Sequence, residues 1–214
     1  MIGFLGGTFD PIHNGHLHAA TSAAAALDLE RVNLVLAARP KHRAQPFASI
    51  GHRWAMLELA AAGDERLHAD DREIRRGTAT YTVETLEEER SQCGAQAPIV
   101  WLLGRDAYRG LPTWYRWREL TALAHLVVLQ RPGDDAQLDD TMREFTAAHR
   151  VNDVALLRLE PAGRVAFVET PMLNVSSTDI RMRLQRGENV EQLLPSAVST
   201  YIKQHHLYRG PSCQ

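Results

Sequence analysis

The chain has 214 residues, of which 44% are hydrophobic and 23% charged, and its formal net charge at pH 7 is −2. This length allows one domain with a sizeable core, and the balanced charge gives no sign of a nucleic-acid or membrane partner. Two distant cysteines, Cys93 and Cys213, predict reduced thiols rather than a disulfide framework. No apolar run is long enough to span a membrane and no signal peptide fits before the first predicted strand, so we expect a cytoplasmic protein.

Apolar runs alternate with helical patterns along the chain. We expect strands at 1–5, 32–37, 67–69, 98–104, 125–130 and 165–169, and helices at 17–27, 50–62, 81–92, 116–123, 138–150, 177–186 and 195–206. Strands that read as apolar runs are typical of a parallel sheet covered on both faces. We therefore predict a single-domain α/β fold over 1–214, a Rossmann-like parallel sheet with helices on both faces. The C-terminal helical part, about 174–208, would pack on the sheet.

The segment from Gly6 to His16, GGTFDPIHNGH, connects the first strand to the first helix. A Gly-Gly turn lets a ligand approach the backbone, and a helix N-terminus offers N–H groups to a phosphate. Two imidazoles, His13 and His16, would stand beside that site as donors. A purely structural turn and a metal-binding His pair are the alternatives, but no ligand set near the pair favours metal. The segment predicts a site for a nucleoside triphosphate.

These eleven residues resemble the bacterial nicotinate-nucleotide adenylyltransferases of the HxGH nucleotidyltransferase superfamily. The resemblance implies the nucleotidyltransferase fold and adenylyl transfer from ATP to nicotinate mononucleotide, a step of NAD biosynthesis. It implies that His16 and His13 are catalytic and contact the triphosphate. The loop residues implied to bind ATP with them are Gly6, Gly7, Thr8 and Phe9.

Basic residues follow two of the expected strands. Read alone, they are ordinary solvated loop charges. The resembling family carries Pro-Pro-His-Lys or Pro-Pro-His-Arg after the second strand, which His42 and Arg43 match, and Arg131 follows the strand at 125–130. The resemblance implies that these three residues contact the phosphate of the mononucleotide or cover the site as a flap.

The loop before the helix at 81–92 is the next candidate. Its pattern predicts a helix entry with Thr80 as the cap. In the resembling family this entry binds the pyridine carboxylate through backbone amides and a Thr hydroxyl, which implies that Tyr81 and Thr82 bind the mononucleotide. N–H donors at a helix start favour a carboxylate over an amide, so we expect the acid to be the preferred substrate.

A strand end at Gly104 is followed by Asp106 and then by two tryptophans. Such an Asp can accept hydrogen bonds from ribose hydroxyls, and we assign Gly104 and Asp106 to ATP binding. Without the resemblance Trp114 would be interpreted as a core residue. With it, Trp114 is expected to stack on the pyridine ring, and Trp117 is its partner in the core.

The second signature is Asn174-Val175-Ser176-Ser177-Thr178-Asp179-Ile180-Arg181. Ser176 and Asp179 predict a capping box, and the capped helix start with two further hydroxyls also suits phosphate. It resembles the Ile-Ser-Ser-Thr-x-Ile-Arg motif of the family. Ser177, Thr178 and Arg181 are therefore expected to bind ATP, with Arg181 also catalytic.

The expected substrates are the small molecules ATP and nicotinate mononucleotide, with Mg²⁺ held mainly by the ATP phosphates and no metal-ligating residues. The protein would be a monomer or a small homo-oligomer. Two alternatives remain open: a phosphopantetheine adenylyltransferase-like enzyme, whose signature usually has Thr at the position of His13, and a non-catalytic module that senses the dinucleotide. A hydrolase is a third class, without a Ser-His-Asp order or a metal set to support it.

Overall fold

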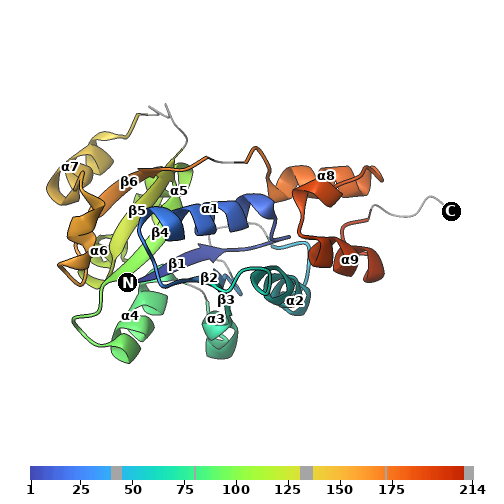
Figure 1. The fold of residues 1–214 in the computed structure, drawn as a ribbon, viewed down its shortest axis with the longest axis horizontal. Coiled ribbons are helices and arrows are strands. Elements are labelled where there is room, and N and C mark those ends of the chain that lie inside the picture. The colour runs from blue at the N-terminus through green and yellow to red at the C-terminus, as the bar shows by residue number, and fades with distance from the viewer. Residues whose placement is uncertain (40–44, 80, 131–136, 172, 210–214) are drawn as a thin grey trace.

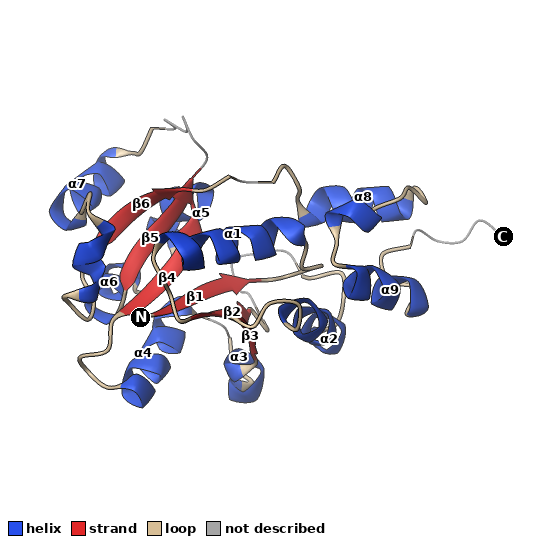
Figure 2. Ribbon diagram, viewed as in Figure 1, coloured by secondary structure: helices blue, strands red, loops and turns tan. Residues whose placement is uncertain are grey.

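The computed structural model describes residues 1–214 except 40–44, 80, 131–136, 172 and 210–214. The strands are β1 (Ile2–Gly7), β2 (Arg31–Leu36), β3 (Leu67–Asp70), β4 (Ile99–Gly104), β5 (His125–Gln130) and β6 (Val165–Glu169). Within the described residues they form a six-stranded parallel sheet in the order β3-β2-β1-β4-β5-β6 (Figure 2). The strand order reverses where β1 pairs with β4, and doubly wound sheets bind ligands outside the carboxyl ends of strands at such a point.

Helices cover both faces of this sheet (Figure 1). They are α1 (Asn14–Ala26), α2 (Ile50–Ala61), α3 (Arg72–Arg76), α4 (Thr82–Cys93), α5 (Arg105–Arg109), α6 (Leu120–Leu123), α7 (Asp140–His149), α8 (Ser177–Gln185) and α9 (Ser196–Gln204), with short 3₁₀ turns η1 (Leu111–Thr113), η2 (Trp117–Glu119), η3 (Val154–Arg158) and η4 (Glu191–Leu193). Side chains of β5 alternate between two core clusters: Val127 and Leu129 pack with α1, α2, α8 and α9, whereas Leu126 and Val128 pack with α4 to α7. The predicted α/β fold with a parallel sheet is confirmed.

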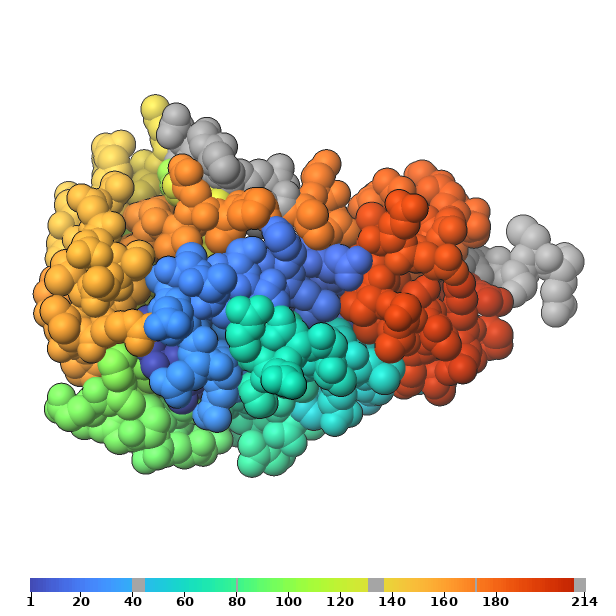
Figure 3. Space-filling view, viewed as in Figure 1, coloured from blue at the N-terminus to red at the C-terminus, as the bar shows by residue number. Residues whose placement is uncertain are grey.

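The C-terminal helices α8 and α9 lie beyond the carboxyl end of β1, next to α2 (Figure 1). In the space-filling view they form one continuous surface with α1 and α2 (Figure 3). Their buried side chains, among them Ile180, Val198 and Ile202, belong to the same cluster as the strands. The residues that follow β1 are therefore enclosed between the sheet end and the C-terminal helices.

One predicted helix differs from the structure, one predicted cap lies outside the described residues, and one short helix was not predicted. The helix expected at 116–123 is a 3₁₀ turn followed by the short α6, because Arg116 adopts a left-handed φ of 50°. Thr80 lies outside the described residues, and α4 has Tyr81 at its N-cap position without a side-chain cap. The residues after Gly104 form the short helix α5, which the sequence did not predict. No helix of the described residues is long and apolar enough to cross a membrane.

Candidate active site

A cleft of about 420 Å³ opens at the carboxyl ends of β1 and β4. Ten of the residues predicted to bind substrate line it: Gly6, Gly7, Thr8, Phe9, His16, Gly104, Trp114, Ser177, Thr178 and Arg181. These residues come from β1 and its loop, β4, the segment after α5, and α8. The fold therefore brings the two signatures and the predicted stacking tryptophan to one cleft of the size that small-molecule ligands occupy.

The absence of a side chain at the cleft glycines has a different structural cause at Gly6 and Gly7 than at Gly104. Gly6 and Gly7 end β1 instead of forming the predicted turn. A Cβ on Gly6 would come within 2.7 Å of the Trp101 ring, and one on Gly7 within 2.6 Å of the Phe9 ring. Both glycines are thus required by aromatic packing; they also line the cleft, and the approach of a ligand to their backbone stays a prediction. A Cβ on Gly104 would meet nothing within 4 Å, so Gly104 leaves the cleft open.

His13 and His16 are stacked at the start of α1, with ring centroids 3.7 Å apart. His13 is the N-cap: the backbone N–H of His16 donates to its Nδ1 at 3.3 Å. Burial lowers the pKa of His13 from 6.5 to about 4, so this imidazole is neutral above that pH. Because Nδ1 accepts, its proton lies on Nε2 and leaves a donor there. His16 lines the cleft, whereas His13 is not among the residues that line it.

The start of α8 combines a cap with contacts to the β1 loop. Ser176 Oγ accepts from the backbone N–H of Asp179 at 3.1 Å, which confirms the predicted N-cap. The reciprocal half of the predicted capping box is not formed, because the carboxylate of Asp179 accepts from Arg183 at 2.8 Å instead. Ser177 Oγ donates to the Pro11 carbonyl at 2.9 Å, so this hydroxyl fixes the loop as well as lining the cleft.

The predicted pyridine-binding residues lie in two segments that touch. The rings of Tyr81 and Tyr115 are 4.7 Å apart, which links the start of α4 to the segment that carries Trp114. Trp114 lines the cleft and Trp117 is buried in the core beside it, as predicted. Tyr81 and Thr82, like the exposed Asp106 on α5, are not among the residues that line the cleft.

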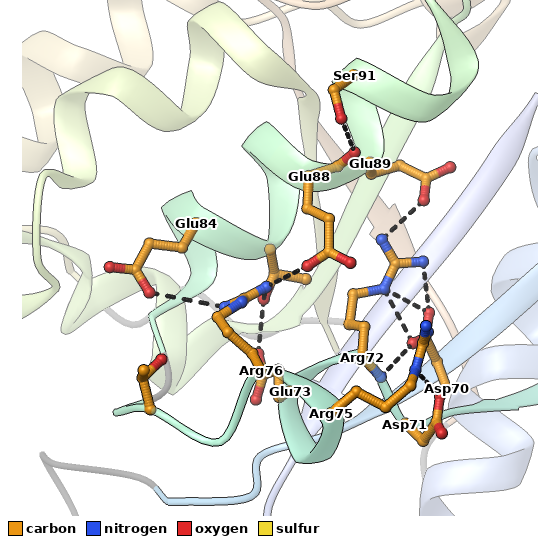
Figure 4. A network of polar contacts seen from close by, with 12 residues as sticks. Asp70, Asp71, Arg72, Glu73, Arg75, Arg76, Glu84, Glu88, Glu89 and Ser91 are labelled. Atoms are coloured by element: carbon orange, nitrogen blue, oxygen red, sulfur yellow. Dashed lines mark hydrogen bonds and ion pairs between the residues drawn. The ribbon is translucent and has the colours of Figure 1, made fainter.

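A network of ion pairs joins the segment from Asp70 to Arg76 to α4 (Figure 4). On its buried side, Arg72 pairs with Asp70 at 2.7 Å and with Glu89 at 2.8 Å. Elsewhere in the network, Thr85 Oγ1 donates to Glu73 Oε1 at 2.7 Å. Burial raises the pKa of Glu73 to about 7, so its charge changes near neutral pH.

Sequence reasoning missed three buried polar residues at the cleft, of which Asp10 lines it and the other two do not. Asp10, Arg53 and Tyr208 are 4%, 1% and 9% exposed. Arg53 donates to four backbone carbonyls, those of Thr8, Ala37, Ala38 and Ala48. The available signal was a charge inside an apolar pattern: Arg53 lies on the buried face of α2, one turn before Met56 and Leu57.

His42, Arg43 and Arg131 lie outside the described residues. Arg105, whose direction the sequence did not indicate, donates to Gln130 Oε1 at 2.7 Å. Within the described part of the chain, no group of three or more His, Cys, Asp or Glu side chains could hold a metal ion.

Comparison with known proteins agrees with this geometry. Residues 4–183 match the family described as cytidylyltransferase-like. The chain is 46% identical over 211 residues to a protein of Pseudomonas fluorescens named "Probable nicotinate-nucleotide adenylyltransferase", covering 99% of this chain and 98% of the relative. A protein of the same name from Pseudomonas aeruginosa is 45% identical over 210 residues, 98% of each chain.

A solved structure of Plasmodium falciparum nicotinic acid mononucleotide adenylyltransferase, complexed with NaAD, has the same fold. Its TM-score is 0.73 at 16% sequence identity, over 97% of this chain and 96% of that one. At this identity the likeness concerns the fold, whereas the two Pseudomonas relatives match in sequence over nearly the whole length. The chain belongs to the nicotinate-nucleotide adenylyltransferase family.

Proposed function

We propose that this enzyme transfers the adenylyl group of ATP to nicotinate mononucleotide, releasing pyrophosphate and nicotinate adenine dinucleotide. The observation that carries the proposal is the convergence of both signatures and Trp114 on one cleft at the β1–β4 switch point. Such a cleft can hold a triphosphate and an aromatic ring together. The near-full-length sequence match to nicotinate-nucleotide adenylyltransferases supports the choice of acceptor.

The reaction is an in-line displacement at the α-phosphorus of ATP. An oxygen of the mononucleotide phosphate attacks, the bond to the β-phosphate bridging oxygen breaks, and pyrophosphate leaves. This nucleophile is already anionic, so the protein's task is positioning and charge stabilisation. His16 would donate to the reacting phosphate, with the neutral His13 behind it. Arg181 and the start of α8, Ser177 and Thr178, would neutralise the leaving pyrophosphate, with Gly7 to Phe9 lining the ATP side.

Magnesium would assist by neutralising phosphate charge, held mainly by the ATP phosphates and water as is usual for this ion. On the acceptor side, Trp114 would stack on the pyridine ring. The backbone N–H groups at the start of α4, behind Tyr81 and Thr82, would donate to its carboxylate, since no side chain caps this helix at Tyr81. His42, Arg43 and Arg131 are proposed for the mononucleotide phosphate, and Asp106 for a ribose.

Pyrophosphate release with ATP, Mg²⁺ and one acceptor at a time tests the proposal. We expect kcat/KM for nicotinate mononucleotide to exceed that for the nicotinamide form at least about 100-fold, because the amide NH₂ would face N–H donors. Trp114→Ala should lower both values by similar factors. Comparable rates on both mononucleotides would refute the argument that N–H donors select the carboxylate. Activity on phosphopantetheine alone would refute nicotinate mononucleotide as the acceptor substrate.

His16→Ala tests the catalytic assignment. Loss of one preorganised donor to a developing charge should lower kcat about 100- to 1000-fold with little change in stability. Turnover within about threefold of wild type in the folded variant would remove His16 from that role.

A further inference from the structure

We propose that Tyr208 is a positioning residue for the triphosphate: its hydroxyl fixes Asp10, and Asp10 fixes Arg181 and Phe47. This inference deepens the function proposed above and rests on it. Tyr208 is not among the residues that line the cleft, so it would act only through its contact with Asp10.

Asp10 joins four parts of the chain that are distant in sequence. Its Oδ1 accepts from the Tyr208 hydroxyl at 2.7 Å and from the backbone N–H of Ala48 at 3.1 Å. Its Oδ2 accepts from the backbone N–H of Phe47 at 2.7 Å and lies 3.9 Å from Arg181 Nη1. The same guanidinium donates to the Asp10 carbonyl at 2.6 Å. One buried side chain therefore sets the relative positions of the β1 loop, the segment before α2, α8 and the C-terminal segment.

Two of the groups that Asp10 holds face the ligand space. Phe47 and Arg181 both line the cleft, and the guanidinium carbon of Arg181 lies 4.6 Å from the centre of the Phe47 ring. Phe47 is 67% exposed, so its position depends on its backbone contact with Asp10 rather than on burial. A small displacement of the Asp10 carboxylate would move the guanidinium proposed to bind the triphosphate.

The backbone near Tyr208 is arranged to bring this ring inward. His206 and Tyr208 have φ values of 52° and 61°, in the left-handed region that residues with a Cβ rarely adopt. Such conformations persist where tertiary contacts hold them. Tyr208 is 9% exposed and packs in the α2–α8–α9 core cluster. Burial raises the pKa of Tyr208 well above its usual range, so the hydroxyl remains a donor.

Tyr208→Phe tests the proposal because it removes the hydroxyl and keeps the ring. We expect the Kd of a non-hydrolysable ATP analogue and the KM for ATP to rise about tenfold, with the KM for nicotinate mononucleotide unchanged within about twofold. The matched control is Tyr108→Phe, which removes another buried hydroxyl, 2.6 Å from Thr146 Oγ1 in the other core cluster. This control should lose stability but keep both KM values.

A double-mutant cycle separates positioning from general destabilisation. In an Arg181→Ala background, Tyr208→Phe should weaken binding of the ATP analogue much less than in the wild type, because the charged group that it positions is absent. Additive effects, or an unchanged Kd in Tyr208→Phe, would overturn the inference. If Tyr208→Phe does not fold, Tyr208→Met, which fills the space without a hydroxyl, takes its place. A wild-type enzyme that binds the ATP analogue but forms no dinucleotide would instead count against the proposed function.

Discussion

Acidification should destabilise this fold through His13. Its imidazole is 5% exposed, and burial lowers its pKa from 6.5 to about 4. As the pH falls below 6.5, His13 is protonated in the unfolded chain but stays neutral in the folded state. The free energy of unfolding therefore declines until the pH reaches the pKa of His13 in the folded state, about 4. Between about pH 7.5 and about pH 5 this difference lowers the free energy of unfolding by about 2 kcal/mol.

The perturbation that isolates this contribution is His13→Asn. Asn is a favoured N-cap residue and can still accept from the backbone N–H of His16, so α1 keeps its start. Urea unfolding at the two pH values should show the wild type losing about 2 kcal/mol more than the variant. His68→Asn, which removes an exposed imidazole, should lose as much stability as the wild type. Equal losses in wild type and His13→Asn would refute the reasoning, because His13 would then be protonated in the folded state.

Three further changes follow from the geometry. Arg181→Ala should raise the KM for ATP and lower kcat in a coupled assay of pyrophosphate release, whereas Arg183→Ala, whose partner is on its own helix, should do neither. Gly104→Ala should fold normally and weaken ATP binding, because its Cβ would project into open space. Gly6→Ala should instead lower the free energy of unfolding, measured in urea, by about 1–3 kcal/mol, because its Cβ would clash with the Trp101 ring. Burial raises the pKa of Glu73 to about 7, so ionising this carboxyl in the folded state lowers the free energy of unfolding as the pH rises toward that value. Between about pH 5 and about pH 8, the wild type should therefore lose about 2 kcal/mol more stability in urea unfolding than Glu73→Gln does.

Periodicity and motifs predicted most of the fold because the strands are buried on both faces. Apolar runs such as 125–130 cannot be solvated and read as parallel strands, which the pairing of β5 with β4 and β6 confirms. Five-residue helices escaped prediction: α3 and α5 are too short to show a period. The helix predicted at 116–123 does not begin at Arg116, because this residue has a left-handed φ. Its guanidinium forms ion pairs with Glu87 and Glu119.

The candidate site was predictable where one segment carries both the backbone geometry and the side chains. The two signatures are of this kind, since a helix start and its neighbouring residues lie within a few positions. The Asp10–Tyr208 contact is not, because 198 positions separate its partners and neither residue type indicates the other. The packing role of Gly6 could not be predicted for the same reason: the ring that excludes a Cβ there belongs to Trp101, on another strand.

An acid beside a proposed triphosphate site requires an explanation, because Asp10 would repel the phosphates. Its charge is offset by the Tyr208 hydroxyl, two backbone N–H groups and the guanidinium of Arg181. What these partners require is two acceptor oxygens, since Oδ1 and Oδ2 each receive a backbone N–H. An asparagine at this position would offer one oxygen and would turn its NH₂ toward another donor, leaving buried groups unpaired. The carboxylate is therefore needed here for its geometry as an acceptor, and the surrounding donors and cations make its charge tolerable.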